Sequence, residues 1–259
     1  MKQKFLQRLS IAFFITITLH IPKPLLSADA GDVTINMQSP RSILEKADEI
    51  RFPGESFQVD VSIITTSPEQ NIETHKYRIL SKGNENSVVM ALEPASERGQ
   101  IMLMKGRNLW IFMPSVSQPI RLALSQRLTG QVANGDLARA NFSGDYNPTL
   151  LRTDVIDGKK YYVLELIGID RSVTYHKVLY WVQQSNFWPY RAEFYSLSGR
   201  LLKTGHYEKF QKTLGKLRPN RLVMKDALSK DKISILEYST MKLRDLPDKV
   251  FTKNYLKKL

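Results

Sequence analysis

Residues 96–122 constrain the fold of this chain more than any other stretch. They predict two strands, residues 100–105 and 108–113, joined by a tight turn at Gly106-Arg107. Apolar side chains occupy both faces of both strands: Ile101 and Leu103 against Met102 and Met104, and Leu109, Ile111 and Met113 against Trp110 and Phe112. A hairpin with one face in water alternates apolar with polar residues, so this hairpin needs cover on both sides. The cover can come from the chain's own helices, from a partner or from an apolar ligand.

Residues 1–30 predict a secretory signal peptide. A basic start is followed by an uncharged, mostly apolar run over residues 9–21 and by a small-x-small cleavage site at Ala28-Asp29-Ala30. The apolar run is shorter than the roughly 20 residues of a membrane-spanning helix, although an uncleaved anchor is the alternative interpretation. The chain has no cysteine, which excludes disulfides and thiolate chemistry. We therefore expect residues 31–259 to form a mature, soluble protein outside the cytoplasmic membrane.

The chain is strongly basic. Its formal net charge of +13 falls to +10 when residues 1–30 are removed. For an exported protein, such a charge favours anionic lipid headgroups or lipopolysaccharide over nucleic acid, and we expect no nucleic-acid partner. Residues 242–259 are the densest basic stretch, with six Lys or Arg residues against Asp245 and Asp248. The alternative is a solvated basic surface that only aids solubility.

After the signal peptide, the pattern predicts one helix and then a series of strands. Ser39-Pro40 is typical of a helix start, and Pro53-Gly54 ends the helix. Four apolar residues of this helix share one face: Ile43, Leu44, Ala47 and Ile50. From residue 56 the apolar period changes to two, and five strands in succession up to residue 113 predict an antiparallel meander.

Residues 121–147 interrupt the strands. They contain glycines and short helical fragments but no convincing strand, and an excursion of this length is usually functional or mobile. Because it directly follows the doubly apolar hairpin, we expect it to cover that hairpin. Strands resume at residue 150 and bring the total to about eleven, and residues 247–259 end in a helical turn. The chain has no internal repeat or low-complexity linker, so residues 31–259 predict a single domain.

No catalytic or metal motif emerges from the sequence. His75, His176 and His206 are far apart, and each falls on a predicted strand without a neighbouring carboxylate cluster. The one S-x-x-K motif, at residues 229–232, lies in a predicted hairpin turn where nothing buries the lysine and lowers its pKa. We expect no catalytic residue, no metal and no cofactor.

Apolar surface is what the sequence offers instead. Four methionines fall within 24 residues of the central strands: Met90, Met102, Met104 and Met113. Methionine is flexible and polarizable and suits a wall that adapts to an acyl chain, although these side chains can equally fill a core. At about 0.8 kcal/mol per buried methylene, a chain of roughly fourteen carbons contributes on the order of 11 kcal/mol before ordering costs.

Three segments and the order of the elements resemble one known family. The segments are Arg98-Gly99 with residues 108–114 (NLWIFMP), residues 188–195 (WPYRAEFY) with 198–203 (SGRLLK), and residues 246–251 (LPDKVF) with Tyr255-Leu256. They are similar to the central hairpin, a later hairpin and the C-terminal end of the LolA-like outer-membrane lipoprotein-sorting family. The resemblance implies a mainly β fold with some α: a curved, incomplete antiparallel β-barrel of about eleven strands, closed by helical lid segments.

The same resemblance implies a non-enzymatic periplasmic carrier. Such a protein holds lipoprotein acyl chains or another lipid in an apolar cavity and passes them towards the outer membrane. It implies an inner-membrane transporter and an outer-membrane acceptor as partners, and we expect a monomer that can also contact an anionic membrane surface. Residues 121–147 are the expected lid. Six side chains are the predicted lipid-binding residues: Phe57, Val59, Met102, Met104, Trp110 and Phe112.

Two other classes stay open at this stage. An envelope interaction or sensor protein would use the doubly apolar strands to bind a membrane-protein partner, with its interior filled by side chains. An enzyme acting on lipid or cell-wall polymer would need an ordered polar cluster, and the sequence contains no sign of one.

Overall fold

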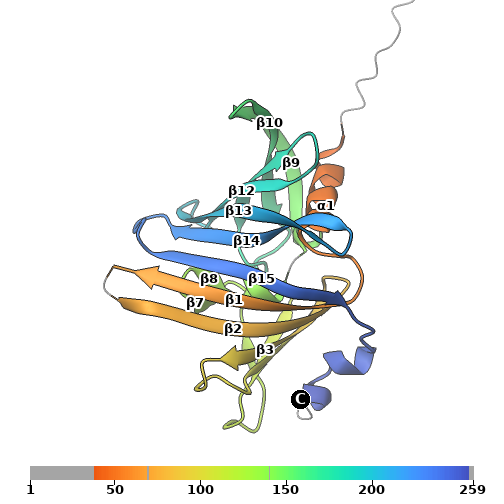
Figure 1. The fold of residues 1–259 in the computed structure, drawn as a ribbon, viewed down its shortest axis with the longest axis vertical. Coiled ribbons are helices and arrows are strands. Elements are labelled where there is room, and N and C mark those ends of the chain that lie inside the picture. The colour runs from red at the N-terminus through yellow and green to blue at the C-terminus, as the bar shows by residue number, and fades with distance from the viewer. Residues whose placement is uncertain (1–37, 69, 140, 257–259) are drawn as a thin grey trace, which may run out of the picture. The chain divides into compact units, whose positions relative to one another are not determined.

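One antiparallel sheet dominates the structure. The computed structural model describes residues 38–68, 70–139 and 141–256, so the predicted signal peptide lies outside the described residues. Thirteen strands follow the order β6-β5-β4-β3-β2-β1-β15-β14-β13-β12-β11-β10-β9. The sheet curves strongly and does not close (Figure 1). Strands β6 and β9 form its two edges. The predicted fold class, a mainly β incomplete barrel, is therefore confirmed, although the sheet has thirteen strands where the sequence predicts about eleven.

The strands of this sheet are β1 (Phe57–Ser67), β2 (Gln70–Lys82), β3 (Asn86–Glu93), β4 (Ile101–Lys105), β5 (Asn108–Phe112), β6 (Ile120–Leu122), β9 (Tyr146–Ile156), β10 (Lys159–Gly168), β11 (Lys177–Gln183), β12 (Pro189–Tyr195), β13 (Leu201–Thr213), β14 (Lys216–Asp226) and β15 (Ile233–Leu243). A separate short hairpin consists of β7 (Arg127–Thr129) and β8 (Val132–Ala133). The helical elements are α1 (Pro40–Arg51), α2 (Asn134–Ala138), α3 (Phe142–Asp145), η1 (Asp248–Phe251) and α4 (Lys253–Leu256).

Helix α1 forms as its sequence predicts. The Ser39 hydroxyl accepts a hydrogen bond from the Ser42 amide at 3.1 Å, and Pro40 occupies the first turn. Ile43, Leu44 and Ala47 are fully buried against the concave face of the sheet. At the other end of the helix, the Arg218 guanidinium on β14 donates to the carbonyls of Glu49 and Ile50, which satisfies groups that a helix end leaves unpaired.

The central hairpin also forms as predicted, and the chain itself covers both of its faces. β4 pairs with β5 across the Gly106-Arg107 turn, with Leu103 opposite Trp110. Met102, Met104 and Leu109 belong to the main core on the concave face. Ile101, Leu103, Trp110 and Phe112 belong to a second cluster on the outer face, here called the outer cluster.

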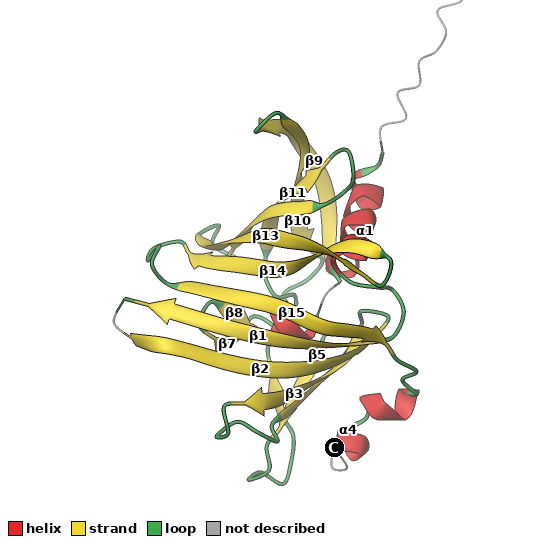
Figure 2. Ribbon diagram, viewed as in Figure 1, coloured by secondary structure: helices red, strands yellow, loops and turns green. Residues whose placement is uncertain are grey.

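The excursion that covers the concave face contains more structure than the sequence predicts. The expectation of no strand in residues 121–147 is wrong, because β6, the β7–β8 hairpin and the start of β9 fall there. Strands β6, β7 and β8 are only two or three residues long, which is too short to show an apolar period. The tip of the hairpin needs Gly130, whose φ is +50° and whose added Cβ would stand 2.3 Å from Ser234 Oγ on β15. The excursion thus packs directly on the sheet (Figure 2).

The C-terminal segment packs on the outer face. Val250, Phe251 and Leu256, from η1 and α4, are buried against Val88, Ile101 and Leu103. Two polar contacts fasten this segment: the Lys253 ammonium lies 4.3 Å from the Trp110 ring centroid, and Lys82 pairs with Asp248 at 2.6 Å. The predicted terminal helical turn is confirmed, and its partner is the outer side of the central hairpin.

Replacing Leu256 with alanine should lower the free energy of unfolding by about 2 kcal/mol, the lower end of the range for a buried leucine, since a terminal turn can readjust. Leu256 is only 1% exposed. Equilibrium urea unfolding measures the change, and Leu197→Ala is the matched control because Leu197 is 61% exposed. Equal stabilities of the two variants would show that the terminal segment does not contribute to the folded sheet.

Candidate ligand pocket

An apolar pocket of about 290 Å³ lies between the β2–β6 part of the sheet and the excursion. Its volume is near the lower limit of small-molecule sites, which span about 300–1,000 Å³. Most of its wall is apolar: Val89, Ala91, Met102, Ile111, Met113, Ile120, Leu122 and Leu128. The polar side chains at its boundary are Tyr77, Glu97, Gln100, Gln126, Arg127 and Asn134. This pocket is called the apolar pocket below.

The register of the strands produces the apolar wall. Val89 on β3 pairs with Met102 on β4, Met102 with Ile111 on β5, and Ile111 with Ile120 on β6. Directly opposed residues of antiparallel strands point to the same face, so these four form one continuous row across the sheet. Leu128, on β7, faces this row from the excursion.

The acidic group at the pocket boundary is already engaged. The Glu97 carboxylate lies 3.1 Å from His75 Nδ1, and the Tyr77 hydroxyl also bonds to it. Burial, followed by the proximity of Glu97, raises the pKa of Tyr77, so its hydroxyl stays protonated and donates. An apolar chain in the pocket would therefore meet a carboxylate whose hydrogen bonds are largely satisfied.

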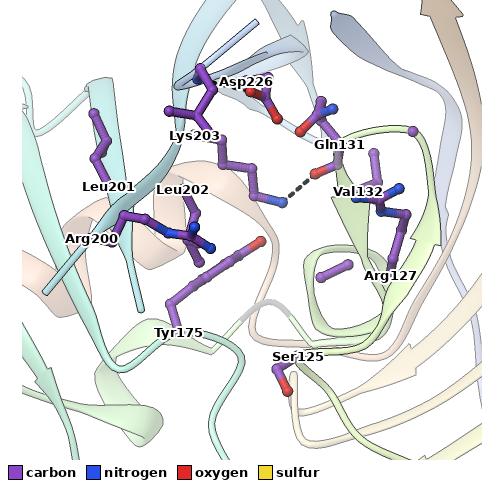
Figure 3. Close-up of a pocket in the computed structure, with 13 residues that line it drawn as sticks. Ser125, Arg127, Gln131, Val132, Tyr175, Arg200, Leu201, Leu202, Lys203 and Asp226 are labelled. Atoms are coloured by element: carbon purple, nitrogen blue, oxygen red, sulfur yellow. Dashed lines mark hydrogen bonds between the residues drawn. The ribbon is translucent and has the colours of Figure 1, made fainter. Parts of the chain in front are cut away.

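A buried ion pair fastens the excursion to the sheet near the pocket. Lys203 Nζ, on β13, lies 3.0 Å from Asp136 Oδ2 on α2 and also donates to the Gln131 carbonyl (Figure 3). The Tyr175 hydroxyl donates to the same Asp136 oxygen at 2.5 Å. Burial, with Asp136 as the next cause, raises the pKa of Tyr175 well above its ordinary value, so the phenol remains a donor. Lys203 and Asp136 are each 7% exposed, so water screens this pair little.

A second buried pair holds the end of the excursion against the central hairpin. The Arg139 guanidinium bonds to both oxygens of Asp145 and donates to the Gly106 carbonyl at 2.8 Å. Asp48 of α1 accepts from the Ser143 amide at 2.7 Å and pairs with Arg51 at 3.1 Å. The excursion is thus attached at several polar points rather than by apolar packing alone.

The structure does not bring the six predicted lipid-binding residues to one face. Phe57, Val59, Met102 and Met104 are buried in the core of the concave face, and of these only Met102 lines the apolar pocket. Trp110 and Phe112 lie in the outer cluster, and their placement on the inner face is wrong. The reason is the β4–β5 register, which sets Trp110 opposite Leu103 and Ile111 opposite Met102. Lipid binding by any of the six stays a prediction.

Most of the pocket wall has no distinctive signal in the sequence. Val89 and Ala91 have the two-residue period of their strand, but nothing in that period marks them as pocket residues, and Leu122 and Leu128 lie on strands too short to show a period. Only the cross-strand register connects them to Met102. The buried ion pair between Lys203 and Asp136 also has no signal in the local sequence, because the two residues are 67 positions apart.

No group of three or more His, Asp or Glu side chains suited to a metal ion occurs among the described residues. His75 pairs with Glu97, and His206 on β13 packs edge-on against Tyr190. His176 falls just before β11 rather than within a strand. The S-x-x-K motif lies in the β14–β15 loop, as predicted. Within residues 38–68, 70–139 and 141–256, no helix is long and apolar enough to cross a membrane.

A curved, unclosed antiparallel sheet with a covered concave face and an apolar pocket defines a carrier-like fold. A solved LolA superfamily protein from Nitrosomonas europaea is 69% identical, with a TM-score of 0.81, and the match covers 84% of this chain and 99% of that one. The chain belongs to the LolA superfamily. A family model with the description "Uncharacterized protein" matches residues 83–258, and a search of curated proteins found no match.

Two more distant structures share the fold alone. A DUF1329 family protein from Desulfovibrio piger is 17% identical with a TM-score of 0.73, and the match covers 84% of this chain and 97% of that one. A putative outer membrane lipoprotein-sorting protein domain from Vibrio parahaemolyticus is 20% identical with a TM-score of 0.70, covering 84% of this chain and 98% of that one.

Proposed function

We propose that this protein is a periplasmic, non-enzymatic carrier that binds acyl chains of lipoproteins or of another lipid and transfers them towards the outer membrane. A signal peptide (residues 1–30) would direct its export, and residues 31–259 would act as one lipid-binding domain. An inner-membrane transporter would load it, an outer-membrane acceptor would receive the cargo, and the basic surface would favour anionic membranes. We propose a monomer, because one chain supplies the whole pocket.

The apolar pocket is the single observation that carries this proposal. Its wall is a row of aliphatic and thioether side chains from four strands, faced by Leu128 of the excursion. Such a wall offers no directional hydrogen bonds and selects for a flexible apolar chain rather than for a polar substrate. Membership of the LolA superfamily and the likeness to a lipoprotein-sorting domain support the same function.

A series of peptides with single acyl chains of increasing length tests the proposal by calorimetry. Each methylene buried in the pocket contributes about 0.8 kcal/mol, so the affinity should rise about fourfold per methylene. The rise should stop when the chain has filled the pocket. The unacylated peptide is the control, and equal binding of acylated and unacylated peptides would contradict the carrier function.

A second candidate function is that of an envelope interaction or sensor protein. The observation that favours it is that the chain's own side chains already fill most of the concave face. α1, the excursion and aromatic residues such as Tyr180 and Tyr207 bury most of that face, which leaves a pocket near the lower size limit. If no acylated peptide binds and a membrane-protein partner copurifies in a stable complex, the interaction function replaces the carrier function.

A further inference from the structure

Arg127 connects the apolar pocket to a charged region on the other side of the β7–β8 hairpin. Arg127 lines the apolar pocket and also two pockets with several charged lining residues, one of about 220 Å³ and one of about 690 Å³. The apolar pocket and the two charged pockets therefore adjoin at this residue. The two charged pockets share Gly130, Gln131 and Leu228 as well, and together they are called the cationic pocket.

Cations outnumber carboxylates in this region. The side chains of Arg127, Arg200, Lys203, Lys230 and Lys232 line the cationic pocket, against Asp226 and Asp231. Asp226 Oδ1 already accepts from the amides of Leu228 and Ser229 at 2.8 Å each. Lys203 is held by Asp136, whereas no ion pair among the described residues involves Arg127, Arg200, Lys230 or Lys232, so these four side chains give the pocket its net positive charge.

The arginines are placed to receive an anion. Figure 3 shows the Arg200 guanidinium, the Lys203 ammonium and the Tyr175 hydroxyl directed toward the centre of the smaller charged pocket. Arg127 and Arg200 are exposed, and no ion pair involves either of them among the described residues. Guanidinium groups bind phosphate oxygens in pairs and lose less hydration than an ammonium group when they do so.

We propose that the cargo is an anionic amphiphile: its acyl chain occupies the apolar pocket and its phosphate-bearing headgroup lies in the cationic pocket, against Arg127 and Arg200. The inference rests on the proposed carrier function and narrows its ligand class to lipids whose phosphate-bearing headgroup has a net negative charge. The β7–β8 hairpin would separate the two parts of the ligand, with Arg127 at the junction between chain and headgroup.

Binding of two short-chain lipids, below their micelle concentrations, tests the inference. A phosphatidylglycerol and the phosphatidylcholine with identical chains are titrated into wild type and into the Arg127→Gln/Arg200→Gln double variant. The anionic lipid should bind wild type about tenfold more tightly, as two charge-assisted contacts predict after screening by solvent. The double variant should lose that preference and bind both lipids like the zwitterionic one. Arg171→Gln, at an exposed arginine outside both pockets, is the matched control and should retain the preference.

The other outcomes separate this inference from the carrier function. Equal binding of the two lipids to wild type, or a preference that survives in the double variant, overturns the anionic headgroup site and leaves the carrier function standing. Binding of neither lipid, while the acylated peptides still bind, overturns the inference alone. If neither the lipids nor the acylated peptides bind, the inference and the carrier function are both overturned. If glycerol phosphate displaces the bound lipid at the same concentration as the whole lipid does, the cationic pocket binds free anions. That result would overturn the proposal that the cargo is an amphiphile.

Discussion

Replacing Asp145 with asparagine should lower the free energy of unfolding by about 3–5 kcal/mol, the usual cost of breaking a buried ion pair by removing one partner. Asp145 and Arg139 are each 4% exposed, and both oxygens of the carboxylate bond to the guanidinium. The amide can accept with one atom only, which leaves the charge of Arg139 buried beside the Gly106 carbonyl. Equilibrium urea unfolding measures the loss.

Two variants control this prediction. Glu49→Gln removes a pair with Lys216 whose side chains are 63% and 51% exposed, and it should cost less than about 1 kcal/mol. The double variant Arg139→Met/Asp145→Leu should recover part of the loss, because it removes both buried charges together. A cost for Asp145→Asn no larger than that for Glu49→Gln would show that this pair does not hold the excursion on the hairpin.

Replacing Ala91 with phenylalanine should weaken binding of the acylated peptides at least tenfold while the protein stays folded. Ala91 lies on β3, lines the apolar pocket and is 7% exposed. The added ring would enter space that the core does not fill, so the cost in stability should stay within about 1 kcal/mol. The space it takes is then lost to the ligand, and the affinity should stop rising at a shorter chain length.

Ala95→Phe is the matched control, since Ala95 lies in the exposed turn between β3 and β4 and does not line the pocket. It should bind every peptide of the series as wild type does. A folded Ala91→Phe variant with an unchanged series would show that acyl chains bind elsewhere or not at all. Circular dichroism and urea unfolding establish that each variant is folded before its binding is compared.

Local patterns in the sequence predicted much of the fold. The capped start of α1, the turn at Gly106-Arg107 and the apolar row of β1 each depend on neighbours within a few residues. The apolar residues on both faces of the central hairpin correctly predict that both faces are covered. In the structure, segments of the same chain cover them. The resemblance to the LolA-like family, carried by three segments, was also correct.

The pocket could be predicted only in part, because it depends on register. A strand's alternation shows which residues share a face, but it does not say which face of the next strand lies beside it. The sequence predicts Met102 and Trp110 on one inner face, but only Met102 lies there, since nothing local shows that Trp110 pairs with Leu103. Ion pairs such as Lys203–Asp136 join residues far apart in the chain and are equally invisible before the fold is known.

The central claim is that the protein binds an acyl chain in the apolar pocket. Native mass spectrometry of the protein as the cell makes it tests this claim most directly. The full chain, expressed with its own N-terminus, is purified from the periplasm without detergent, weighed intact, and extracted with organic solvent. The account predicts a bound species of defined mass that the solvent releases and that carries at least one acyl chain. A clean mass for the protein alone, with no uptake when lipids or acylated peptides are offered, would contradict it.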